Sequence, residues 1–284
     1  SHPQTLARLL TWHARFLRLL GHVEEARDLL DRGLSMLDGS DKTDAYTVNA
    51  LATVLGELST LIKDFDRDRS CHLRQQSLTL FRQVDNRSAM ATALRRRGEL
   101  AADMGDFAAA NRFLEESLTL ARDLGDRRAV AAVLHSMATA YATHGMLARS
   151  QALSRQAIAI HEELGDTYRA CMGRLEQASS MAYAGKFRQA YTLFEEVAAG
   201  FDELGAQVPH ATAVHLGAWM LVNLGEYAEA ETEHQRAEDL LEESGDRRAQ
   251  AMNLLGSGEI ALAPAAGDIG EHTLTVDVQD DGSP

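Results

Sequence analysis

Histidine, cysteine and glycine are central to most metal and catalytic motifs, and their spacing in this sequence matches none of them. His210 and His215 are five residues apart, which is the wrong step for one helix face, and no HExxH motif occurs. Cys71 and Cys171 fit neither a metal-ligand spacing nor a disulfide framework. The stretch LGSGEI at residues 255–260 lacks the spacing and the lysine of a P-loop, and GxSxG is absent. The sequence therefore predicts no catalytic residue, no metal and no cofactor.

Charge and composition exclude further classes of protein. The net charge is −14, and the acidic excess lies beyond residue 100. An acidic chain is a poor partner for a phosphate backbone, so no direct nucleic-acid binding is expected. No stretch approaches the apolar length that spans a bilayer, and no signal peptide opens the chain, which predicts no membrane association. Cysteines without a disulfide framework predict a reducing, cytoplasmic compartment.

Glycines recur at a fixed interval along the chain and predict its organisation. Two interleaved series share a period of 40 residues: Gly105, Gly145, Gly185 and Gly225, and Gly125, Gly165, Gly205 and Gly245. The segments between them show apolar residues at three- and four-residue spacing, which is typical of amphipathic helices. A turn glycine can end a helix in the left-handed conformation, and an Asp after it can cap the next helix. The pattern predicts an array of helix–turn–helix–turn units.

Small residues also recur in register with these turns. Five residues after the turn glycine of successive repeats stand Ala26, Ala110, Ser150, Ala190 and Ala230. Seven residues before it stand Ala14, Gly98, Ala138, Ala178 and Ala218. Small side chains at two fixed points allow the backbones of antiparallel helices to approach closely, so both columns are expected at helix contacts.

These columns resemble the tetratricopeptide repeat (TPR), whose usual period is about 34 residues. The resemblance implies an all-α, right-handed superhelical solenoid of antiparallel helix pairs. The array is expected to span residues 1–263, with six pairs and one extra helix. Its second repeat lacks a turn glycine and is expected to be irregular near residues 63–70. Residues 264–284 lack helical periodicity and are predicted to form a non-helical acidic tail.

The sequence segments that link the repeats resemble those of a more specific group of TPR proteins. LARDLGDRRAVAAVL, HEELGDTYRACMGRL and LEESGDRRAQAMNLL are similar to the long-period TPR arrays that end bacterial signal-transduction ATPases with numerous domains (STAND) and related regulators. This resemblance implies a non-catalytic sensor that binds a protein or peptide in its concave groove. It also implies a longer chain with an N-terminal nucleotide-binding effector. The alternatives are a stand-alone TPR adaptor, and a regulator whose superhelix tightens around a peptide or small molecule.

In TPR arrays, one stripe of the first helix in each repeat lines the concave groove. By register with the turn glycines, the resemblance implies a partner-binding stripe that is basic near the N-terminus and aromatic and polar near the C-terminus, with Trp219 as the expected anchor. The stripe comprises Arg8, Arg15, Arg18, Arg95, Glu99, His135, Thr139, Ser179, Tyr183, His215, Trp219 and Asn223.

Three consecutive arginines, Arg95, Arg96 and Arg97, form the main basic cluster. Consecutive helical residues point in different directions, so this cluster is expected to be a solvated helix face. Arg97 and Arg174, however, stand at positions that hold Met or Leu in other repeats. Each of them either extends to solvent or has a partner inside the array.

Overall fold

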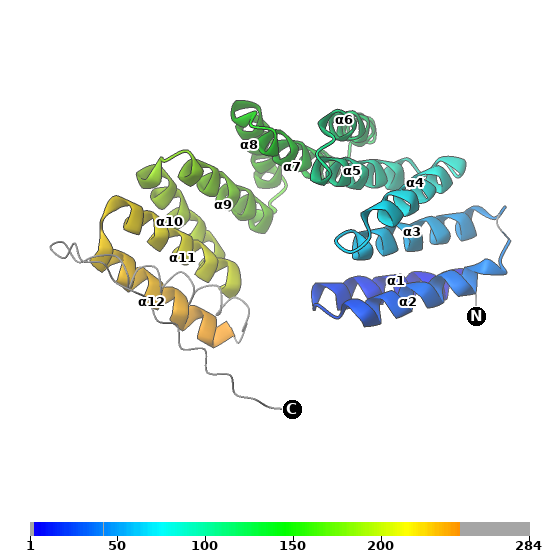
Figure 1. The fold of residues 1–284 in the computed structure, drawn as a ribbon, viewed down its shortest axis with the longest axis horizontal. Helices are drawn as coiled ribbons and strands as arrows, with labels where there is room; N and C mark the ends of the chain where they lie inside the picture. The colour runs from blue at the N-terminus through cyan, green and yellow to red at the C-terminus, as the bar shows by residue number, and fades with distance from the viewer. Residues whose placement is uncertain (1–2, 42, 245–284) are drawn as a thin grey trace. The chain divides into compact units, whose positions relative to one another are not determined.

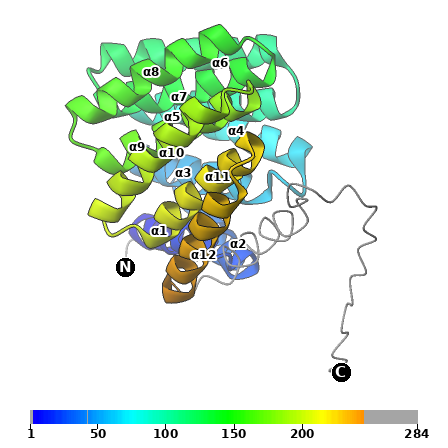
Figure 2. The ribbon, with the colours of Figure 1, turned by 90° about the vertical axis from the view of Figure 1, so that its left-hand side faces the viewer.

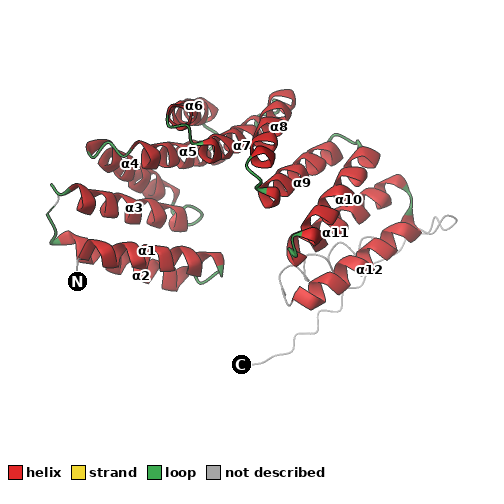
Figure 3. Cartoon of the chain, turned by 180° about the vertical axis from the view of Figure 1, so that it is seen from behind, coloured by secondary structure: helices red, strands yellow, loops and turns green. Residues whose placement is uncertain are grey.

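The computed structural model describes residues 3–41 and 43–244, and every regular element in them is a helix (Figure 3). The predicted all-α fold is confirmed. The predicted extra helix before residue 263 and the predicted tail at residues 264–284 lie outside the described residues. The described helices are α1 (Pro3–Leu19), α2 (Val23–Asp38), α3 (Ala45–Ile62), α4 (Arg67–Gln83), α5 (Arg87–Asp103), α6 (Phe107–Asp123), α7 (Arg127–Thr143), α8 (Leu147–Glu163), α9 (Thr167–Tyr183), α10 (Phe187–Glu203), α11 (Gln207–Leu224) and α12 (Tyr227–Ser244).

The chain divides into two compact units, Ser1–Gly173 and Arg174–Pro284, which we call unit one and unit two. In unit one, α1 packs on α2, α3 on α4, α5 on α6 and α7 on α8, as antiparallel pairs (Figures 1 and 2). The second helix of one pair also packs on the first helix of the next, as α4 does on α5 and α6 on α7. In unit two, α11 packs on both α10 and α12. This sequential pairing is that of a TPR-like solenoid.

The turns have the conformation that the glycine spacing predicts. Gly105 has a φ of 79°, in the left-handed region that glycine adopts without a Cβ clash. The side chain of Asp106 then accepts a hydrogen bond of 2.9 Å from the backbone N–H of Ala109 and caps α6. The turn between α4 and α5 has no glycine, and Asp85 takes the left-handed conformation there, with a φ of 49°.

The columns of small residues lie at helix contacts, as predicted. Ala26, Ala110 and Ala218 are fully buried. A Cβ on Gly98 would lie 2.6 Å from Cγ of Leu114, closer than real Cβ atoms approach a neighbour. A larger residue at position 98 would therefore push α5 away from α6.

Helix α3 is more apolar than the sequence analysis led us to expect. Its 18-residue window has a mean hydropathy of 1.2, so by length and composition alone it could cross a membrane. The expectation that no such stretch exists was therefore wrong. Within unit one, 56% of that window is buried, and Val54 and Leu58 of α3 lie in the same core cluster as Leu30 of α2. Packing in the array accounts for the apolar character of α3.

Candidate functional site

The first helices of the pairs in unit one, α1, α3, α5 and α7, form what we call the first-helix face. Helix α1 packs directly on α3, and α5 packs directly on α7. Among the described helices, α3 and α5 share little close contact, and a pocket of about 180 Å³ lies between them. We call it the Glu57 pocket. It is lined by Arg15, Ala52, Thr53, Gly56, Glu57, Ser59, Arg74, Ser77, Phe81, Ala89, Thr92, Ala93 and Arg96.

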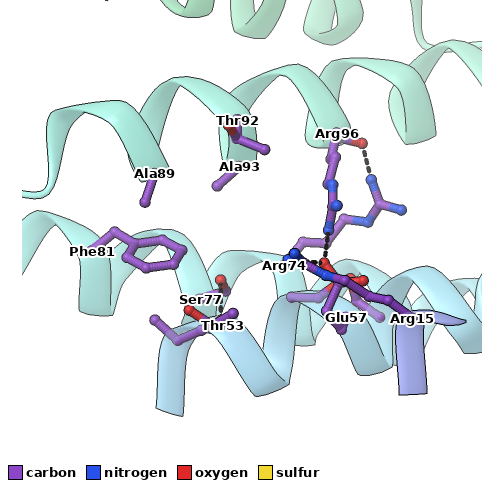
Figure 4. Close-up of a pocket in the computed structure, with 13 residues that line it drawn as sticks. Arg15, Thr53, Glu57, Arg74, Ser77, Phe81, Ala89, Thr92, Ala93 and Arg96 are labelled. Carbon is purple, nitrogen blue, oxygen red and sulfur yellow. Dashed lines mark hydrogen bonds and ion pairs between the residues drawn. The ribbon is translucent and has the colours of Figure 1, made fainter. Parts of the chain in front are cut away.

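The Glu57 pocket has a charged end and an apolar end. Figure 4 shows Arg15, Glu57 and Arg96 converging at one end, while Phe81 and Ala89 lie at the other. Helices α1, α3 and α5 supply the three charged residues, whereas the ring of Phe81 comes from α4. A pocket built in this way offers both charge and apolar surface to one small group.

Glu57 is the centre of the charged end and is only 3% exposed. Nη2 of Arg15 and Nη1 of Arg96 both donate hydrogen bonds to its Oε1, at 2.8 and 2.7 Å. Burial by itself raises the pKa of Glu57, but the charge of Arg96 and the hydrogen bond from Arg15 outweigh burial and hold the pKa below its ordinary value. Glu57 is therefore a carboxylate at neutral pH, fixed between two guanidinium groups.

Arg74 is the other deeply buried charge of the pocket and is 5% exposed. Its Nη1 donates to the backbone carbonyl of Arg96, while its Nε has no hydrogen-bond partner among the described residues. Burial and the charge of Arg96 lower the pKa of Arg74 to about 10, and Glu99 and Asp103 act in the opposite direction. Arg74 is thus still charged at neutral pH. The lining of the pocket holds three guanidinium groups and one carboxylate.

The three consecutive arginines of α5 reach three different partners. Arg95 forms an ion pair with Glu99 on its own helix, and Arg96 binds the carboxylate of the pocket. The guanidinium of Arg97 lies 4.1 Å from the centroid of the Phe113 ring, a cation–π contact. All three arginines are half-buried, so the cluster is not the solvated helix face that we expected.

Seven residues of the predicted stripe belong to unit one, and four of them, Arg8, Arg15, Arg95 and Glu99, connect neighbouring first helices. Arg15 reaches Glu57 and is the member of the stripe that lines the pocket. Nη1 of Arg8 donates to the hydroxyl of Tyr46 on α3 at 2.8 Å. Glu99 accepts a hydrogen bond of 2.6 Å from the hydroxyl of Ser136 on α7. The seven residues are Arg8, Arg15, Arg18, Arg95, Glu99, His135 and Thr139.

Five residues of the stripe belong to unit two, where they lie on α11 and on the part of α9 beyond Gly173. Tyr183 is 94% exposed, whereas Trp219 is half-buried. Nδ1 of His215 lies 3.3 Å from Nδ1 of His234 on α12. The described ranges contain no group of three or more His, Cys, Asp or Glu that could hold a metal ion. The five stripe residues are Ser179, Tyr183, His215, Trp219 and Asn223.

Three charged residues of the pocket, Glu57, Arg74 and Arg96, were not predicted as site residues. Glu57 belongs to the repeat without a turn glycine, which left its register unassigned. Arg74 lies on a second helix, and the groove expectation used first helices alone. One signal was present in the sequence, because Glu57 is the single charged residue of α3. A lone carboxylate in so apolar a helix requires a cationic partner.

A tetratricopeptide repeat family model matches residues 89–163, which run from α5 to α8. Tetratricopeptide repeats are present in this segment. The period of 40 residues and the helix pairing extend the same pattern beyond the matched segment. No curated protein matches this sequence significantly.

Solved structures share the fold. A Rap protein in complex with competence and sporulation factor has a TM-score of 0.64 at 12% identity, covering 90% of this chain and 76% of that chain. BtubC from P. vanneervenii has a TM-score of 0.59 at 17% identity, covering 72% of this chain and 82% of that chain. A STAND protein with a tetratricopeptide repeat sensor from Pyrococcus horikoshii has a TM-score of 0.58 at 14% identity, covering 89% of this chain and 39% of that chain. At these identities the likeness shows the fold alone.

Proposed function

We propose that this chain is a non-catalytic recognition scaffold that binds a protein or peptide on its first-helix face. The observation that carries the proposal is the Glu57 pocket, which combines buried charge with an adjoining apolar end. Recognition sites of this kind use a few well-placed polar groups for orientation and apolar surface for affinity. The tetratricopeptide repeats at residues 89–163 support the same function.

A ligand bound at this face can change the arrangement of neighbouring helix pairs through two ion pairs. The ion pair between Arg15 and Glu57 joins α1 to α3, and the ion pair between Arg96 and Glu57 joins α3 to α5. A ligand that competes for these guanidinium groups changes how neighbouring helix pairs are held together. Such a ligand shifts the array toward whichever arrangement binds it more tightly.

We further propose that the scaffold is the sensor of a cytoplasmic bacterial multidomain signalling protein with an N-terminal nucleotide-binding effector. The phrases that link its repeats and its likeness in fold to the STAND sensor structure support this setting. The stand-alone adaptor is the alternative. Immunoblotting of the native protein separates the two, since the sensor predicts a mass well above the 31.0 kDa of this chain and the adaptor predicts no such excess.

Selection from a displayed peptide library tests the proposed function. We expect the wild-type chain to enrich a consistent set of peptides, and the double variant Arg15→Gln/Arg96→Gln to bind them at least tenfold more weakly. Arg82→Gln is the matched control, because Arg82 is exposed and its ion pair joins α4 to Glu116 on α6, away from the first-helix face. Equal binding by all three proteins, each shown by circular dichroism to be folded, would place recognition elsewhere.

A further inference from the structure

No ion pair among the described residues offsets the cost of burying the guanidinium group of Arg74. Arg15 and Arg96 both bind Glu57, so this carboxylate is already shared between two cations. Arg74 has no ion pair with any carboxylate of the described residues, and its Nη1 donates to the backbone carbonyl of Arg96. Burying a cation without a counterion costs several kcal/mol. The lining therefore has an excess of positive charge, which a bound anion would reduce.

The apolar end of the pocket limits which negatively charged groups fit beside Arg74. Phe81 is 7% exposed, and Ala89, Ala93 and Thr92 of α5 complete the wall around it. The pocket measures about 180 Å³. A dry engineered cavity of about 150 Å³ in another protein accommodates benzene, so a group of roughly six to ten non-hydrogen atoms fits here.

We propose that the Glu57 pocket binds a carboxylate carried on a compact apolar group, with the carboxylate beside Arg74 and Arg96 and the apolar group against Phe81 and Ala93. The inference rests on the proposed function and deepens it, because it names the chemistry of the ligand at the same face. Guanidinium groups bind carboxylates through paired, charge-assisted hydrogen bonds, and Nε of Arg74 is a buried donor without a hydrogen-bond partner among the described residues.

Two kinds of ligand carry a carboxylate on a compact apolar group. One is a free small acid, and the other is the C-terminal residue of a peptide with an apolar side chain. Benzoate represents the first, and N-acetyl-Ala-Ala-Phe with a free carboxylate represents the second. Each has a neutral control of nearly the same shape, benzamide for the acid and the C-terminal amide for the peptide. Benzylammonium supplies the opposite charge.

Titration calorimetry on the whole chain tests the inference. We expect at least one of the two carboxylates to bind at least tenfold more tightly than its neutral control, and benzylammonium not to bind. The tighter of the two carboxylates identifies the source. Carboxylates that bind no better than their neutral controls, or that do not bind at all, would overturn the inference.

Variants locate the binding on Arg74. Arg74→Met should weaken carboxylate binding at least tenfold, whereas Arg97→Met, which changes an arginine outside the pocket, should leave it within twofold. Binding by Arg74→Met equal to that of the wild type overturns the assignment. If Arg74→Met does not fold, Ala93→Leu decides instead. It fills the apolar end without altering charge and should also weaken binding at least tenfold, and unchanged binding overturns the inference.

The outcomes also separate this inference from the proposed function. Peptides selected from the library can depend on Arg15 and Arg96 while neither carboxylate binds. In that case the first-helix face recognises its ligand without a carboxylate in the pocket, and only the further inference fails. If no peptide is selected but benzoate binds through Arg74, the pocket is a small-molecule site and recognition of a peptide is the part that fails.

Discussion

At the scale of single residues, Glu57 and Arg74 are buried charges in very different situations. Glu57 accepts hydrogen bonds from two guanidinium groups, while the guanidinium of Arg74 contacts a carbonyl oxygen and no described carboxylate. Removing one member of a buried ion pair leaves its partners with unpaired charge, whereas removing a charge that has no counterion relieves a cost. The two side chains should therefore respond to neutralisation in opposite directions.

Two neutralising variants test this difference. Glu57→Gln leaves Arg15 and Arg96 without a countercharge, and we expect the free energy of unfolding to fall by about 3 kcal/mol. Arg74→Met keeps most of the apolar stem, and we expect a change near zero or an increase. Urea denaturation followed by circular dichroism measures both. A larger loss for Arg74→Met than for Glu57→Gln would show that Arg74 serves the fold and not a ligand.

At the scale of helices and turns, the sequence was a good guide because the causes are local. A turn glycine, an Asp after it and small residues at fixed offsets determine how one helix ends and the next begins. The Glu57 pocket has a cause that is not local, since Glu57 meets Arg15 and Arg96 from positions 42 and 39 residues away. Glu57 also lies in the one repeat where the glycine register is missing. A single sequence without that register could not bring the three residues together.

The caps of the helices give a prediction at the same scale. Asp106 caps α6 with its side chain, whereas Met146 stands at the N-cap of α8 without a side-chain hydrogen bond. Asp106→Ala should lower the free energy of unfolding by about 1 kcal/mol, and Met146→Asp should raise it by up to about 1 kcal/mol. Thermal melts of the two variants measure the changes. Shifts in the same direction would contradict the capping role.

At the scale of the whole molecule, each unit contains a buried histidine whose pKa burial lowers. His161 in unit one and His210 in unit two have pKa values below the ordinary 6.5, with Asp166 and Asp202 acting in the opposite direction. Because the unfolded chain binds these protons more readily, the associated stability is complete above pH 6.5 and falls as the pH drops toward the folded pKa values.

Acidification should therefore destabilise the chain in a way that depends on these histidines. We expect the thermal midpoint to be lower at pH 5.5 than at pH 7.5. Each histidine lowers the free energy of unfolding by at most about 1.4 kcal/mol per pH unit. His210→Asn removes one titrating group and should make the fall shallower than in the wild type. The same slope in the wild type and in His210→Asn would rule out this contribution.

The account rests on the claim that a ligand binds the first-helix face of unit one. Hydrogen exchange with mass spectrometry, with and without a peptide selected by the wild-type chain, locates the ligand without any mutation. We expect the ligand to slow exchange in α3 and α5, which carry Glu57 and Arg96. Protection confined to second helices such as α6 and α8, or to unit two, with α3 and α5 unchanged, would contradict the claim.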